Sequence, residues 1–139
     1  MIILDTNILS ALMQTKPDIP VINWLNNVAV ESIWLTSITI FEIHFGLELL
    51  PDSKRRDALT TQFEQVVETD LNGRVLPFNQ DAANMAAILA ANRRKAGKTV
   101  DMRDTFIAGI VLAGKAAIAT RNTKHFLDLE AEVINPWEL

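Results

Sequence analysis

The sequence has no cysteine, and only two of its 139 residues are histidine. Without cysteine, the chain has no disulfides, thiolate metal ligands or cysteine nucleophiles, and its composition agrees with a reducing compartment. The uninterrupted apolar stretches, such as 85–91, are far shorter than the ~20 residues that span a bilayer. Met1 leads directly into an apolar segment without the basic residues of a secretion signal. We therefore expect a cytoplasmic protein with no membrane contact.

Glycine and proline are scarce and scattered, with five of each, and no segment has the composition of a linker or a repeat. A chain of this length has the usual size of one domain, so we predict a single domain over residues 1–139. The 13 Lys and Arg against 17 Asp and Glu give a formal charge of -4. At first sight, this charge argues against a protein that coats nucleic acid by excess positive charge.

Short apolar segments alternate with longer amphipathic ones, which is typical of βαβ units. The short segments predict strands at 2–4, 33–35, 75–76, 118–120 and 133–134. The long ones predict helices that begin at the N-caps Ser37, Ser53, Asn79 and Asp101. The pattern favours an α/β fold with a mainly parallel sheet and helices on both faces.

In such a sheet, ligands bind beyond the carboxyl ends of the strands. Polar residues follow the first and fourth predicted strands at these ends, namely Asp5, Thr6, Asn7, Thr120, Arg121 and Asn122. We therefore expect the functional site at this edge of the sheet.

Two further carboxylates share a helix face with apolar residues. At about 100° per residue, Glu42 lies in a stripe with Ile38, Phe45 and Leu49, and Asp104 lies with Ile107, Ala108 and Val111. His44 points away from its stripe, and we expect it to be solvated. Together with Asp5, three carboxylates from three separate elements are predicted to point inward.

Inward carboxylates need a partner, because two such charges about 4 Å apart repel by about 4 kcal/mol at an effective dielectric constant near 20. Oxygen ligands without cysteine favour Mg²⁺ or Mn²⁺, which suit phosphoryl chemistry. Structural explanations stay open for each residue by itself. Asp5 is a good helix cap, and Asp104 with Asp101 is typical of an acidic first turn. Glu42 by itself is also explained by pairing with an arginine.

Four motifs occur in order along the chain and resemble those of the PIN domain. They are ILDTN at 3–7, SITIFE at 37–42 with Gly46, DTFIA at 104–108, and ATRNT at 119–123 with Phe126. With the closing NPW at 135–137, the chain resembles the toxin branch of that family. This branch contains the VapC and FitB-like endoribonucleases of type II toxin–antitoxin systems.

This resemblance implies a three-layer α/β/α domain that cleaves RNA with Mg²⁺ or Mn²⁺. Asp5, Glu42 and Asp104 match the catalytic, metal-binding acids of the family. Asn122 stands at a fourth position that is acidic in many members; its amide oxygen is a ligand without charge, so we expect one strong metal site. The remaining matches are Thr6, Asn7 and Thr120, which orient carboxylates or substrate, and Arg121, a candidate phosphate contact.

The resemblance also implies partners. We expect a homodimer, inhibited by a small antitoxin whose DNA-binding domain brings the complex to operator DNA. An antitoxin arginine that enters the acidic site would compete with the metal.

The charge is unevenly distributed along the chain. Residues 93–124 carry eight Lys and Arg against Asp101 and Asp104, and the rest of the chain is strongly acidic. This segment brackets two site positions, as an electrostatic track for an RNA backbone should, although a solvated helix face gives the same pattern.

Two other functions fit parts of the sequence. A haloacid-dehalogenase-type phosphatase also uses an aspartate after its first strand, but Asn7 stands where that chemistry needs a second acid. A PIN-like binding module with weak catalysis, acting with a DNA-binding partner, is supported by Asn122.

Overall fold

The computed structural model describes residues 1–16 and 18–139 and has a five-stranded parallel sheet at its centre. The strand order is β3-β2-β1-β4-β5, and every neighbouring pair is parallel. The strands are β1 (Ile2–Leu4), β2 (Ile33–Thr36), β3 (Val75–Leu76), β4 (Ala117–Ala119) and β5 (Val133–Ile134). Each lies within one residue of its predicted position, and the predicted sheet type is confirmed.

The described residues form six α-helices and three short helical turns. The helices are α1 (Thr6–Leu12), α2 (Ile19–Asn26), α3 (Ser37–Leu49), α4 (Lys54–Gln65), α5 (Gln80–Lys95) and α6 (Met102–Gly114). The turns are η1 (Val30–Ser32), η2 (Val66–Asp70) and η3 (Thr123–His125). None of these helices is long and apolar enough to cross a membrane.

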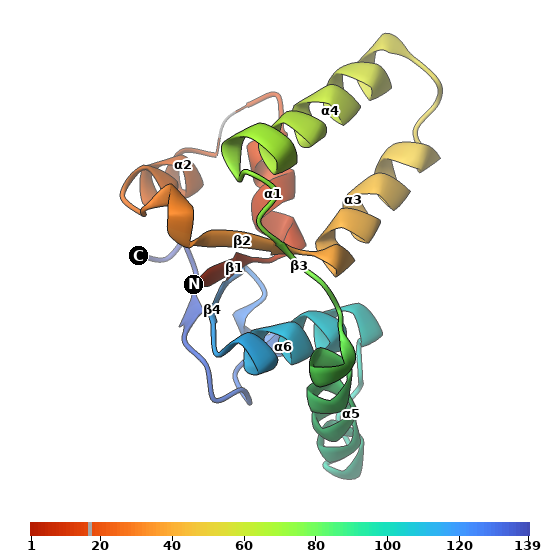
Figure 1. Cartoon of the computed structure of the whole chain (residues 1–139), viewed down its shortest axis with the longest axis vertical. Coiled ribbons are helices and arrows are strands. Elements are labelled where there is room, and N and C mark those ends of the chain that lie inside the picture. Colours follow the sequence, from red (N-terminus) through yellow and green to blue (C-terminus); the bar gives the residue numbers. More distant parts are fainter. Residues whose placement is uncertain (17) are drawn as a thin grey trace.

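Helices cover both faces of the sheet, which makes three layers (Figure 1). Successive residues of a strand point to opposite faces, so the central strand β1 contributes to two hydrophobic cores. Leu4 packs with α1, α2, α3 and α4, whereas Ile3 packs with α5 and α6. The predicted α/β/α architecture is confirmed.

Most of the predicted N-caps are present. Ser53, Asn79 and Asp101 each accept a hydrogen bond from a backbone N–H of the following turn. The prediction for Ser37 is wrong, because Thr36 caps α3 and accepts from the backbone N–H of Thr39 at 3.2 Å. Thr36 keeps the extended backbone that an N-cap needs, while the Ser37 hydroxyl accepts from the backbone of Phe78.

The predicted core face of α3 is also wrong. The residues of α3 that are buried are Thr39, Ile43 and Leu47, whereas Phe45 is 44% exposed and Leu49 is 71% exposed. Apolar residues occupy several sides of this helix, so their period does not show which side meets the core. The side is set by the packing of α3 against α1, α4 and β2. Glu42 therefore lies at the border of the buried face.

Candidate functional site

A cavity of about 440 Å³ lies at the carboxyl ends of β1 and β4. Asp5, Glu42 and Asp104 all line it, together with Thr6, Asn7, Arg121 and Asn122. These residues come from the strand ends and from the first turns of α1 and α6, with Glu42 from the second turn of α3. The fold thus brings together side chains that are far apart in the sequence, and we call this space the acidic cavity.

Asp5 is the most deeply buried acid of the cavity, with 3% of its surface exposed. It is the N-cap of α1, and its Oδ1 accepts from the backbone N–H of Thr6 at 2.8 Å. Its Oδ2 accepts from the Thr120 hydroxyl at 2.7 Å and from the Asn7 amide at 3.4 Å. The carboxylate is therefore held in one orientation by groups that follow two neighbouring strands.

Burial raises the pKa of Asp5 to about 6 from an ordinary value of 3.8. Hydrogen bonds from Thr120 and Thr6 lower this pKa, but they do not compensate for the loss of solvent. The negative charges of Asp104 and Glu42 raise it further. The hydrogen bonds within the cavity therefore do not fully compensate for the burial of the Asp5 charge and its repulsion by the other acids.

Glu42 faces the cavity from α3, with 20% of its side chain exposed. Its Oε1 accepts from the Thr6 hydroxyl at 2.9 Å. Its Oε2 lies 3.7 Å from the guanidinium of Arg103, which is half exposed and stands over the rings of Phe41 and Phe45. An ion pair at this distance with a half-exposed guanidinium is weak, so it does not prevent Glu42 from binding another ligand.

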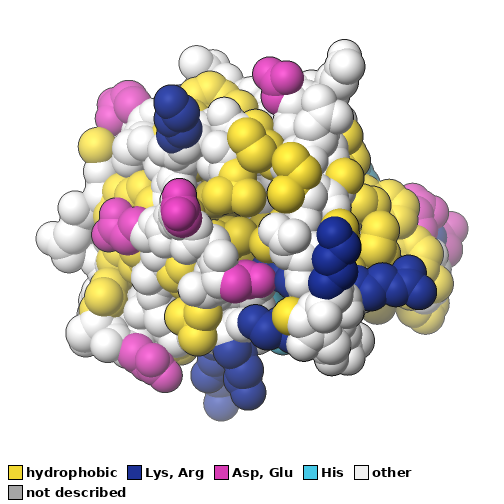
Figure 2. Space-filling view, turned by 90° about the horizontal axis from the view of Figure 1, so that it is seen from below, with side chains coloured by type: hydrophobic (Ala, Val, Ile, Leu, Met, Phe, Trp, Pro, Cys, Tyr) yellow, Lys and Arg dark blue, Asp and Glu magenta, His cyan; other side chains and the backbone are white. Residues whose placement is uncertain are grey.

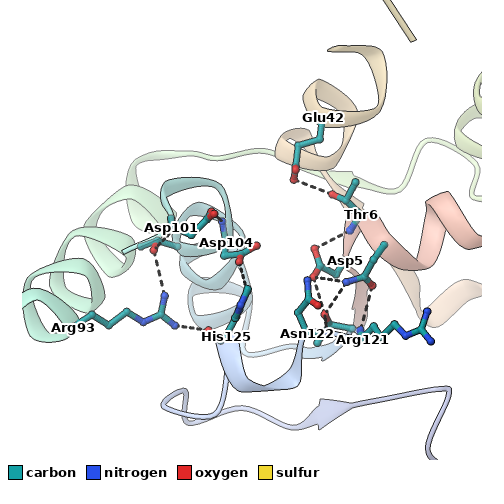
Figure 3. A network of polar contacts seen from close by, with 12 residues as sticks. Asp5, Thr6, Glu42, Arg93, Asp101, Asp104, Arg121, Asn122 and His125 are labelled. Atoms are coloured by element: carbon teal, nitrogen blue, oxygen red, sulfur yellow. Dashed lines mark hydrogen bonds and ion pairs between the residues drawn. The ribbon is translucent and has the colours of Figure 1, made fainter. Parts of the chain in front are cut away.

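Asp104 lies in the first turn of α6, where its backbone N–H donates to Asp101 at 3.0 Å. Its Oδ2 lies 2.5 Å from Nδ1 of His125 in η3. Figure 3 shows this pair on one side of the site, with Asp5 and Thr6 on the other. Asp104 is therefore an acid of the first turn of α6, as the structural explanation predicted, and it also lines the acidic cavity.

The loop after β4 forms the rim of the cavity. The Arg121 backbone N–H donates to the Asn7 side chain at 3.2 Å, and that of Asn122 donates to Thr120 Oγ1 at 3.0 Å. The guanidinium of Arg121 points away from Asp5 (Figure 3) and lies 4.7 Å from the ring centre of Trp137. Arg121 is therefore positioned at the mouth of the cavity.

Several residues of the site were not identified from the sequence. Trp137 donates from its indole to Asp18 at 2.9 Å, and both line the acidic cavity. The NPW motif was a signal for Trp137, but no spacing rule connects it to a residue 119 positions away. Likewise, His125 and Arg103 reach the site only through contacts of the folded chain.

The acids of the cavity do not form a closed metal cage as they stand. In residues 1–16 and 18–139, no three His, Asp or Glu side chains lie close enough together to hold one metal ion. Their chemistry nevertheless fits a hard divalent cation, because the donors are carboxylate and amide oxygens. The raised pKa of Asp5 agrees with this fit, since a cation would favour the charged form of that buried group.

The fold and the site together define a class: α/β/α domains that gather carboxylates at the carboxyl edge of a parallel sheet. The chain belongs to the PIN domain family, because the family model matches residues 2–131.

Relatives cover the whole chain. It is 39% identical over 138 residues to the VapC ribonuclease Y4jK of Sinorhizobium fredii, with 99% of both chains covered. It is 32% identical over 137 residues to the toxin FitB of Neisseria gonorrhoeae, again with 99% of both chains covered. The solved structure of FitAB bound to the IR36 DNA fragment matches with a TM-score of 0.91 and 32% identity, over 100% of this chain and 97% of the other.

These matches confirm the predicted resemblance to the VapC and FitB-like branch of the PIN family. They leave the alternative haloacid-dehalogenase-type assignment without support, because the family model extends over nearly the whole sheet and both helical layers.

Proposed function

We propose that the protein is a metal-dependent endoribonuclease and the toxin of a type II toxin–antitoxin module. The observation that carries this proposal is the acidic cavity, where Asp5, Glu42 and Asp104 converge from three elements. A buried carboxylate with a raised pKa, beside two other acids, is more typical of a functional site than of a structural one. The VapC ribonuclease and the FitB toxin, both at least 32% identical to this chain, support the same activity.

Asp5, Glu42, Asp104 and Asn122 would hold Mg²⁺ or Mn²⁺ in the acidic cavity. When bound, such a cation neutralises phosphate charge, polarises the phosphodiester oxygens and increases the acidity of water. Asn122 adds an oxygen without charge, so we expect one strong metal site.

Other residues prepare the carboxylates for this role. Thr120 and Asn7 both donate to Oδ2 of Asp5, so they fix its orientation and stabilise its charged form. The Thr6 hydroxyl donates to Oε1 of Glu42 and fixes the orientation of that carboxylate. Arg121, which lines the rim of the cavity and stacks on Trp137, would contact a phosphate of the substrate.

We also propose a cognate antitoxin with a DNA-binding domain, and a homodimer of the toxin. The proposal rests on the relatives, one of which was solved as FitAB on a DNA fragment. Co-expression with the antitoxin should give a complex that binds operator DNA, whereas the toxin alone should not. A toxin that is monomeric in solution would contradict the homodimer.

The proposed reaction is tested with RNA, Mg²⁺ or Mn²⁺, and a chelator. We expect cleavage by the wild type only with metal, and a loss of activity in Glu42→Gln. Glu48→Gln is the matched control on the same helix, because Glu48 is 72% exposed and outside the cavity. Cleavage that resists the chelator would contradict the mechanism. A wild type that binds the antitoxin and never cleaves RNA would identify the binding module instead.

Metal binding has a readout that does not depend on activity. Mn²⁺ should raise the melting temperature of the wild type progressively once its concentration exceeds its Kd, and the rise should be much smaller for Asp5→Asn. An equal rise in both proteins would place the metal outside the acidic cavity.

A further inference from the structure

A second cavity, of about 470 Å³, shares the side chain of Asp104 with the acidic cavity. Its wall is formed by the end of α5, the turn before α6 and the segment around η3. The cations on this wall are Arg93, Lys98 and Lys124, and Thr99 and His125 add polar groups. We call this space the lysine pocket.

The carboxylates of the lysine pocket already have partners, and Asp104 lies 2.5 Å from Nδ1 of His125. Arg93 binds Asp128 with two hydrogen bonds of 2.8 Å, and Asp101 accepts from the α6 backbone. By contrast, Lys98 and Lys124 are exposed and make no ion pair with any residue that the structure describes. Two lysine ammonium groups without an ion pair therefore line the pocket, and the charge of Lys98 also helps to lower the pKa of Asp128.

The wall of the lysine pocket is held in place by Arg93, which is 8% exposed. Besides pairing with Asp128, its guanidinium donates to the backbone carbonyl of His125 at 2.7 Å and to the Thr105 hydroxyl at 3.2 Å. Thr105 in turn donates to the carbonyl of Asp101 at 2.6 Å. One buried side chain thus connects α5, α6 and the segment after β4, so the pocket has a defined shape before any ligand binds.

The acidic cavity, in contrast, repels a polyanion. Four carboxylates line it against one guanidinium: Asp5, Asp18, Glu42 and Asp104 against Arg121. Even with a divalent cation bound, this cavity contributes little net attraction for an RNA backbone, so affinity must come from neighbouring surface. In Figure 2, most of the Lys and Arg side chains gather in the lower right part of the face that is shown, while most Asp and Glu side chains lie elsewhere.

We propose that the lysine pocket binds a backbone phosphate of the RNA that flanks the phosphodiester in the acidic cavity. The inference rests on the proposed ribonuclease function and adds a second phosphate site to it. Because Asp104 belongs to both walls, a single strand that enters one cavity passes directly beside the other. Lys98 and Lys124 supply charge to the strand without reading its sequence.

The experiment measures RNA binding in the Asp5→Asn background, where no cleavage interferes. The probe is a short single-stranded RNA of random sequence with a fluorescein label, followed by anisotropy between about 50 and 200 mM salt. Lys98→Gln and Lys124→Gln should each weaken binding several-fold and reduce the slope of log K against log salt by about 0.7. Lys115→Gln is the control, because Lys115 is exposed at the opposite end of α6.

In the wild-type background, the same two substitutions should raise KM for RNA cleavage and leave kcat unchanged. Variants that match Lys115→Gln in affinity, salt slope and KM would overturn the proposal. Loss of affinity for duplex DNA without any loss for RNA would also overturn it and assign the pocket to DNA. A wild type that cleaves no RNA would instead refute the proposed function, since the binding measurement does not require cleavage.

Discussion

Asp5 and Arg93 both carry buried ionisable side chains, and their surroundings act on the two charges in opposite ways. Asp5 is 3% exposed, and its pKa is raised to about 6 because burial outweighs its hydrogen bonds. Arg93 is 8% exposed, and its pKa is also raised, but in this case because the hydrogen bonds that it donates to Asp128 favour its charged form. The charge of Asp5 is destabilised by its surroundings, and that of Arg93 is stabilised.

This difference is the one expected between a functional charge and a structural one. A charge that serves only the fold is retained where its partners compensate for its lost hydration, as they do at Arg93. A charge kept without full compensation needs another explanation, and a bound cation is the simplest for Asp5. Substitutions at the two sites should therefore affect stability with opposite signs.

The largest effect is expected for Asp5→Asn. RNA cleavage should fall by about 10³-fold, because several kcal/mol of charge stabilisation depend on this ligand. The free energy of unfolding should nevertheless rise by about 1 to 3 kcal/mol, since the penalty between a pKa of about 6 and 3.8 disappears. Urea denaturation with a chelator measures this, with the exposed Asp52→Asn as control. An Asp5→Asn protein less stable than the wild type would show that the charge of Asp5 is not destabilised by its surroundings.

The second prediction concerns pH. Folded Asp5 has the raised pKa, so it holds its proton more tightly than the unfolded chain does between about pH 4 and 6. The stability advantage of Asp5→Asn over the metal-free wild type should therefore be complete above pH 6 and vanish near pH 4. The pKa of Asp128 is lowered by its hydrogen bonds from Arg93, so its contribution should persist to about pH 4 and be lost only below.

Denaturation of both proteins at several pH values tests this difference. An Asp5→Asn advantage that stays constant down to pH 4 would show that burial does not raise the pKa of Asp5.

The third prediction is that Asp128→Asn destabilises the fold by about 2 kcal/mol. The substitution removes the carboxylate that pairs with the buried guanidinium of Arg93. Because Asp128 is partly exposed, the loss of stability should be smaller than for a fully buried pair. Glu48→Gln breaks an exposed pair with Arg56 of the same type and should cost less than about 1 kcal/mol. If urea denaturation showed the same loss in free energy of unfolding for Asp128→Asn and Glu48→Gln, the buried and the exposed ion pair would not differ in strength.

The smallest effect is expected for Thr120→Val, which removes the hydroxyl that donates to Asp5. The pKa of Asp5 should rise above about 6, because the hydrogen bond that lowers it most is lost. Metal affinity and cleavage should fall about tenfold. NMR titration of Asp5 and manganese binding measure the two effects, and Thr60→Val, which loses only a bond within α4, is the control. An unchanged pKa would show that Thr120 does not tune this acid.

Most of the fold could be predicted because its signals are local. Each strand is a short apolar run, and Asn79 and Asp101 cap helices through side chains that reach only three residues along the chain. The wrong predictions occurred where two local solutions compete. Thr36 and Ser37 are both good N-caps, and α3 has apolar residues on several sides. Packing against neighbouring elements therefore decides which residue caps α3 and which side of the helix is buried.

The site was only partly predictable, for a related reason. Asp5, Glu42 and Asp104 were selected because each is an acid beside apolar residues and lies in a motif that resembles the PIN domain, although the apolar stripe predicted around Glu42 is not the buried face of α3. No pattern of this kind marks His125 beside Asp104, Trp137 beside Asp18, or the connection of Arg93 to the segment after β4. Such contacts arise when parallel strands bring distant loops to one edge.

Local order along the chain was thus enough to determine the α/β pattern and the parallel sheet and to select the acids that line the cavity, because each depends on spacing or residue type. The raised pKa of Asp5, the compensated charge of Arg93 and the two cavities that share Asp104 depend on packing. Solvent exclusion and the distance between charges determine those properties, and both exist only after the layers have come together.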